Sequence, residues 1–274
     1  MTRVAWFEFR RSPFLYLSVP LFAIEVIGMN GAIDDWAGTW SAASVAAVWP
    51  MFIIASVLTG ACAYLGVSRS LRGESILANA AVRRWKIEAA MLLPPVAVAT
   101  ATLAVGITWA HVIAWPTAHE GEGWIRAGFP LLGYSLMLIG CAVGHLTGRL
   151  VPSYWAPPVA AFGILAVAVT VGTPDGLLFV PMSAPIHLTL RPSAVLLPIA
   201  AGVVALGTAA LAVGARRRPE APPTARRAVL GIGLATVALT IAVVAGQPSL
   251  VPRTDNARPV CTSTSPRLCV FPEM

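Results

Sequence analysis

The chain has 274 residues, of which 57% are hydrophobic and only 11% are charged. A soluble domain carries about 25% charged residues, so these few charges cannot cover a water-facing surface, and the composition favours lipid as the solvent. The net charge of +7 would also suit nucleic-acid binding, but the positions of the basic residues, described below, argue against a nucleic-acid partner.

Apolar runs along the chain predict an all-α, polytopic helical membrane protein. A helix needs about 20 apolar residues to cross the hydrocarbon core. The first run is followed by no small-x-small cleavage site, so we interpret it as a retained span rather than a signal peptide. The predicted spans are residues 14–29, 42–67, 89–115, 128–147, 154–172, 193–215 and 228–246. The first six form one transmembrane body over residues 14–215, and the seventh is a separate transmembrane helix.

Basic residues predict the orientation of these spans. If the N-terminus is cytoplasmic, 14 of the 19 Lys and Arg residues fall on the cytoplasmic side, as the positive-inside rule requires. We therefore expect a multi-pass protein of the cell membrane with its C-terminus outside. The same arrangement explains the basic charge without nucleic acid.

Three segments outside the six-span body have distinct compositions. Residues 1–13 predict a short amphipathic helix on the inner membrane surface, with Trp6 and Phe9 on its apolar side. Residues 216–227 form a basic, proline-rich cytoplasmic linker, and residues 247–274 form an extracytoplasmic tail. In that tail Cys261 and Cys269 could form a disulfide in an oxidising compartment; the alternatives are two free thiols or pairing with another molecule.

The motifs of soluble catalysis are missing from the sequence. The only lysine is Lys86, and it does not lie in a phosphate-binding GxxxxGK[ST] loop. HExxH, GxSxG and CxxC patterns are also absent. We therefore expect no catalytic residue, no cofactor and no metal site, and we do not expect an enzyme.

A few polar or small residues within the spans are candidates for a functional or packing role. Glu25 lies in the first span, where an ionisable group marks a functional site or a buried polar contact; if the span is shorter, Glu25 is solvated at the outer interface. Gly140, Gly144 and Gly148 form a stripe of small residues that predicts close helix packing, within the subunit or across a dimer. His145, near the end of its span, favours an interfacial hydrogen bond over metal binding.

The longest cytoplasmic loop, residues 68–87, contains a partly apolar helical pattern. Ile76, Leu77 and Trp85 share one broad side, and basic residues cluster at its end, although Arg84 interrupts that side. An exposed helix of this kind binds a partner protein or lies on the membrane surface.

Residues 8–13 and 72–85 resemble two segments of the permease subunits of type-2 ABC exporters, namely the exit of an interfacial helix and the coupling helix. The resemblance implies a separate ABC ATPase partner and a homodimer or a heterodimer with another permease. It also implies coupling residues, which are Arg72, Glu74, Ile76, Leu77, Arg83, Arg84 and Trp85. The seventh span and the tail resemble membrane subunits that carry an extra external domain.

The expected function is therefore that of the permease subunit of an ABC-type exporter, driven by ATP that a separate subunit hydrolyses. The substrate is not identified. An alternative is a membrane anchor or sensor that presents an extracytoplasmic C-terminal domain and transports nothing. A third class, an ion-coupled carrier, would need several paired charges within the membrane, and Glu25 is the only such residue that the sequence offers.

Overall fold

In the computed structural model, the described residues form the helices, some of the short turns between them and one pair of short strands. Nearly all of these residues are helical. The described residues are 6, 9–10, 12–31, 33–38, 40–71, 84–118, 128–151, 153–171, 192–216, 260–261 and 269–270.

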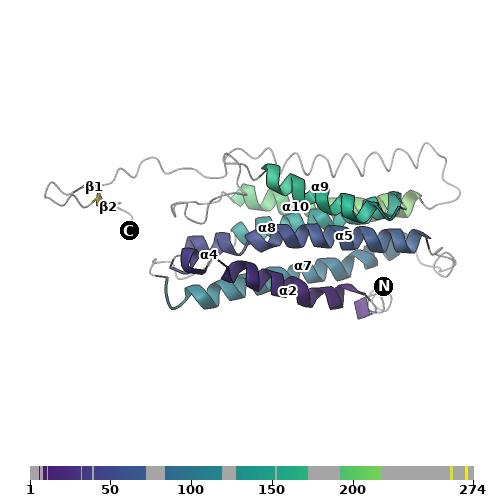
Figure 1. Ribbon diagram of the computed structural model, residues 1–274. Coiled ribbons are helices and arrows are strands. Elements are labelled where there is room, and N and C mark those ends of the chain that lie inside the picture. Colours follow the sequence, from purple (N-terminus) through teal and green to yellow (C-terminus); the bar gives the residue numbers. More distant parts are fainter. Residues whose placement is uncertain are drawn as a thin grey trace.

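The helices form an up-and-down bundle in which the long helices alternate in direction (Figure 1). The N-terminal end of the bundle holds the start of α2, and the opposite end holds the short helices α3 and α4. In chain order the helices are α2 (Phe14–Asn30), α3 (Ile33–Trp36), α4 (Trp40–Ala46), α5 (Trp49–Leu71), α7 (Arg84–Ala114), α8 (Gly128–Leu150), α9 (Ala156–Val171) and α10 (Pro192–Arg216).

Three stretches are long and apolar enough to cross a membrane, namely Ala42–Leu71, Trp85–Ala114 and Phe129–Leu150. Shorter apolar helices cover Phe14–Asn30, Ala156–Ala166 and Ala200–Leu211. Each of the first six predicted spans thus coincides with apolar helix, which confirms a helical protein suited to a membrane. The seventh predicted span, residues 228–246, lies outside the described residues, as do residues 217–227 of the predicted linker.

A turn at Ala47 and Val48 divides the second predicted span into α4 and α5. Pro50 has no backbone N–H and cannot donate to a carbonyl four residues earlier, so the regular helical ladder is interrupted. Around this gap the N–H of Val48 donates to the carbonyl of Val45, and the N–H of Met51 donates to that of Val48. Pro50 itself falls in the first turn of α5, where a missing N–H is tolerated.

The most extensive helix contact joins α5 and α8, and the glycine stripe makes it possible. A Cβ atom at Gly144 would collide with the carbonyl oxygen of Thr59, and one at Gly148 would collide with that of Ala63. The two backbones therefore approach as closely as small residues allow. The stripe packs within the subunit, which confirms one of the two predicted alternatives.

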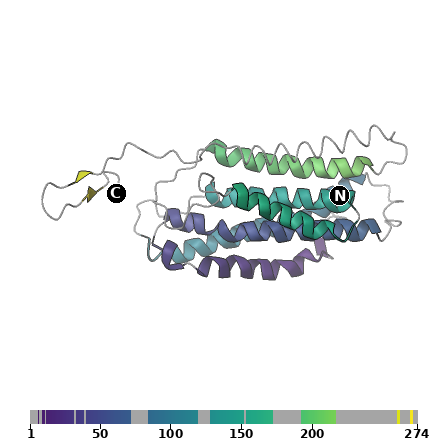
Figure 2. The ribbon, with the colours of Figure 1, turned by 45° about the horizontal axis from the view of Figure 1, so that its top comes forward.

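The remaining long helices surround this pair. Helix α9 packs mainly on α5, α10 packs on α8 and α7, and α2 packs on α7 and α5 (Figure 2). The link between α8 and α9 is only residues 151–155, so these helices are antiparallel neighbours. The core contains Leu58, Met137 and Ile139, which are almost completely buried.

Two short strands pair in the tail. Strand β1 (Val260–Cys261) runs antiparallel to β2 (Cys269–Val270), and the register places Cys261 opposite Cys269. Figure 2 shows this hairpin clear of the helices. The backbone thus brings together the two tail cysteines that the sequence singled out.

Candidate functional site

A buried ion pair joins α7 to α8 near the N-terminal end of the bundle. Arg149, close to the end of α8, donates from Nη2 to Oε1 of Glu88 at 2.8 Å and from Nε to Oε2 at 3.2 Å. The Arg149 and Glu88 side chains are only 1% and 4% exposed. Such a bidentate ion pair is directional as well as strong, because the planar guanidinium group matches the geometry of the carboxylate.

His145 completes this cluster from the preceding turn of α8. Its Nε2 atom lies 3.0 Å from Oε2 of Glu88. The contact is short, but its angles are not those of an aligned hydrogen bond. His145 and Arg149 are four residues apart, so they lie on the same face of the helix, and both meet the single carboxylate of α7. Nη2 of Arg149 also lies 3.4 Å from the sulfur of Met91.

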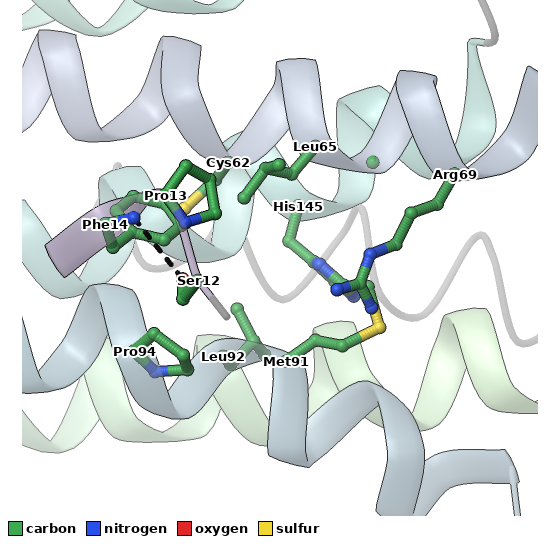
Figure 3. A pocket seen from close by; sticks show the side chains of 11 residues that line it. Ser12, Pro13, Phe14, Cys62, Leu65, Arg69, Met91, Leu92, Pro94 and His145 are labelled. Atoms are coloured by element: carbon green, nitrogen blue, oxygen red, sulfur yellow. Dashed lines mark hydrogen bonds between the residues drawn. The ribbon is translucent and has the colours of Figure 1, made fainter. Parts of the chain in front are cut away.

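A small pocket adjoins the cluster, and it brings four parts of the chain together (Figure 3). Its water-accessible space of about 20 Å³ is enough for roughly one water molecule. Its polar lining side chains include His145, Arg69 and Ser12, all of which Figure 3 labels. The lining residues come from the start of α2, from α5, from α7 and from α8, and they are Ser12, Pro13, Phe14, Cys62, Leu65, Gly66, Arg69, Met91, Leu92, Pro94 and His145.

The predicted interfacial helix meets this site at its exit. Ser12 is buried, and its hydroxyl oxygen accepts a 3.3 Å hydrogen bond from the N–H of Phe14 at the start of α2. Upstream, the rings of Trp6 and Phe9 are stacked at 6.2 Å, and the guanidinium of Arg10 lies 5.0 Å from the Trp6 ring centre. These contacts agree with a helical aromatic face, although most of residues 1–13 lie outside the described residues.

The predicted coupling residues lie next to the cluster in sequence. Residues 72–83, which include Arg72, Glu74, Ile76, Leu77 and Arg83, lie outside the described residues. Arg84 and Trp85 form the first turn of α7, one turn before Glu88, so they begin the long helix rather than end a separate short one. Trp85 is half-buried, with Nζ of Lys86 lying 5.8 Å from its ring centre.

Glu25 lies in a different part of the bundle, nearer the opposite end. It is completely buried, and neither carboxyl oxygen has a hydrogen-bond partner within the described part of the chain. A Cβ atom at Gly106 would collide with its Oε1 atom, so the carboxyl group fills the space next to this glycine of α7. The alternative of a solvated Glu25 at the interface is therefore wrong for this structure.

The sequence interpretation missed Glu88 and Arg149. Glu88 precedes the predicted span that starts at residue 89, and Arg149 follows the predicted span that ends at residue 147. The contact joins residues 61 positions apart, which no local pattern reveals. The available signal was the four-residue spacing of His145 and Arg149, which places two polar groups on one face of an apolar helix.

The cluster has no obvious bond-making chemistry. Within the described residues, no group of three or more His, Cys, Asp or Glu side chains is placed to hold a metal ion. Cys62 and Cys141 are buried free thiols. What the arrangement provides is an electrostatic connection between the start of α7 and the end of α8.

Comparisons with known protein families, with curated proteins and with solved structures found no match to this chain.

Proposed function

We propose that the chain is the permease subunit of an ABC-type exporter, powered by a separate ATPase that docks on residues 72–86. In this proposal the chain crosses the membrane seven times, with the N-terminal end of the bundle in the cytoplasm. A second permease copy, identical or related, completes the transporter.

The observation that carries the proposal is that the ion-paired cluster follows the predicted docking segment directly in the sequence, near the start of α7. Residues 72–83 connect the end of α5 to the start of α7. Glu88 lies four residues into α7 from Arg84, and it is held by Arg149 of α8. A force applied to the docking segment would therefore reach α8 through a rigid, directional contact.

The pocket extends this connection to two further elements. Ser12 at the exit of the N-terminal segment and Arg69 near the end of α5 line the same small cavity as His145. The N-terminal segment, α5, α7 and α8 therefore meet at the end of the bundle where α5 ends and α7 begins. This convergence supports a role in passing movement from a docked partner to the helices.

Charge distribution supports the proposed orientation. All the Lys and Arg residues in the described part of the chain lie at the N-terminal end of the bundle, and they are Arg10, Arg69, Arg84, Lys86, Arg149 and Arg216. This is the asymmetry expected if that end faces the cytoplasm.

The test starts from the genes beside this one, where we expect an ABC ATPase to be encoded. That ATPase is co-expressed with this chain, and the chain is purified through a tag. We expect the ATPase to co-purify and to hydrolyse ATP faster in proteoliposomes with the wild-type chain than alone. Trp85→Glu, combined with charged substitutions at Ile76 and Leu77, should abolish co-purification, because a charge in an apolar docking surface is left unpaired.

The matched control is Trp115→Glu. Trp115 follows the last residue of the same helix, about 45 Å from Trp85 at the rise of an α-helix, and it is 65% exposed. This variant should keep the ATPase bound. Co-purification that survives the combined change at residues 76, 77 and 85 would contradict the docking assignment.

The β1–β2 hairpin favours a second candidate, a membrane anchor that presents an external C-terminal part and transports nothing.

For either function we propose a disulfide between Cys261 and Cys269. Directly opposite residues in antiparallel strands have Cα atoms roughly 4.5–5.5 Å apart, within the range that disulfides span. Mass spectrometry of the unreduced protein should find the two tail cysteines joined, whereas alkylation of both without reduction would contradict the bond.

A further inference from the structure

Glu25 is the one intramembrane carboxyl group of the described residues that the proposed coupling path does not use. It lies in the last third of α2, about 8 Å from the end of that helix at Asn30 by helical rise. Its side chain is fully buried, and both of its oxygens lack a hydrogen-bond partner in the described part of the chain.

The groups that the structure places next to this carboxyl group are a backbone without a side chain and an apolar side chain. On α7, Gly106 provides only backbone, and a Cβ atom there would lie 3.2 Å from the Glu25 carboxyl carbon and 3.3 Å from the methyl carbon of Met51. The carboxyl group therefore occupies a gap that is lined by a glycine and by an apolar side chain of α5.

Apart from His111, the charged and titratable groups of α5 and α7 lie far along these helices from this gap. On α7, Lys86 and Glu88 precede Gly106 by about 27–30 Å of helix, and on α5 the first such group, Cys62, follows Met51 by about 16 Å. On α7, His111 lies one to two turns beyond Gly106. Its ring packs on Trp40 and Trp115, with centroids 5.1 and 5.3 Å away.

We propose that Glu25 is a proton-binding site inside the bundle. Its carboxyl group is held as the neutral acid between α2 and α7, and it exchanges its proton with water only when these two helices separate. An ionised carboxylate without a partner is among the most costly groups to keep in an apolar interior, and such a group takes up a proton instead. The inference concerns the bundle itself and does not depend on the permease role.

The chain contains its own control, because Glu88 is equally buried but lies against Arg149 and His145. The two glutamates should therefore have opposite protonation states at neutral pH, Glu25 neutral and Glu88 ionised. Infrared spectroscopy distinguishes them, because the carbonyl band of a neutral carboxylic acid is separate from the bands of a carboxylate.

The experiment uses the purified full-length protein in lipid bilayers at neutral pH. We expect the wild type to show a neutral-acid band that Glu25→Gln removes and Glu88→Gln retains. After transfer to D₂O this band should shift to its deuterated position slowly, because no water reaches the acid. A band that persists in Glu25→Gln would overturn the proposal, and an immediate shift in D₂O would overturn its dependence on helix separation.

A second measurement covers the case in which Glu25→Gln does not fold. Wild-type protein labelled with ¹³C-glutamate, together with the labelled Glu88→Gln variant, should show an isotope-shifted neutral-acid band. If neither labelled protein has a neutral glutamic acid band, the proposal is wrong.

Discussion

Substitution of the Glu88–Arg149 pair gives the sharpest prediction for the stability of the bundle. Removing one partner, as in Glu88→Leu or Arg149→Met, leaves the other charge buried without its counter-ion. Breaking a buried pair in this way lowers the free energy of unfolding by about 3–5 kcal/mol. With both side chains nearly inaccessible and two short contacts, this pair should fall within that range.

The double variant should behave differently from the sum of the two single variants. At a separation of about 3 Å and an effective dielectric constant of about 20, the attraction is roughly 5 kcal/mol. The cost of taking both ions out of water offsets much of that gain, so apolar replacement of a whole pair is often neutral or stabilising. We therefore expect the double variant to be more stable than either single variant.

Reversible unfolding in bicelles of the wild type, the two single variants and the double variant measures the coupling energy between Glu88 and Arg149. The reasoning predicts that the summed losses of the single variants exceed the loss of the double variant by at least about 3 kcal/mol. Losses that simply add, or single variants that each lose less than about 1 kcal/mol, the value of an exposed pair, would refute it.

Three further outcomes follow from the packing and the predicted topology. Gly144→Ala should lower the unfolding free energy by about 1–3 kcal/mol, because its methyl group would press on the backbone of α5. As a control, the methyl group of Gly163→Ala meets open space, so this variant should be neutral or slightly stabilising. Equal effects of the two variants in thermal unfolding would contradict the close approach of α5 and α8. Glu25→Met should raise the unfolding free energy by about 1–3 kcal/mol by removing an unsatisfied buried polar group, and a measured loss would show that Glu25 has a partner. A membrane-impermeant maleimide applied to intact cells should label reduced Cys261 but not a cysteine introduced by Arg84→Cys, and the reverse pattern would contradict the orientation.

Apolar run length was enough to locate most of the helices. The predicted first span ends at residue 29 and α2 ends at Asn30, and the sixth predicted span differs from α10 by one residue at each end. These elements agree because a membrane-length apolar run leaves the backbone few options other than helix. The glycine stripe was likewise readable, since four-residue spacing places small residues on one helical face.

The candidate site was less predictable because its parts do not look apolar. Helix α7 begins at Arg84 and includes Lys86 and Glu88, all of which hydropathy assigns to a loop. Glu88 becomes a core residue only when Arg149 reaches it from α8, and this contact depends on how the two helices pack. The predicted orientation stays a prediction, because the helices are assigned as spans by length and composition only, which does not tell which end faces the cytoplasm.

The most direct measurement of the central claim is ATP hydrolysis by the expected ABC ATPase partner in proteoliposomes that contain either this chain or its Glu88→Gln variant. We expect the wild-type chain to bind the ATPase and stimulate hydrolysis, and we expect the variant to bind it equally well with reduced stimulation. An ATPase that neither binds the wild-type chain nor responds to it would contradict the permease assignment, and full stimulation by the variant would contradict the role of the buried pair.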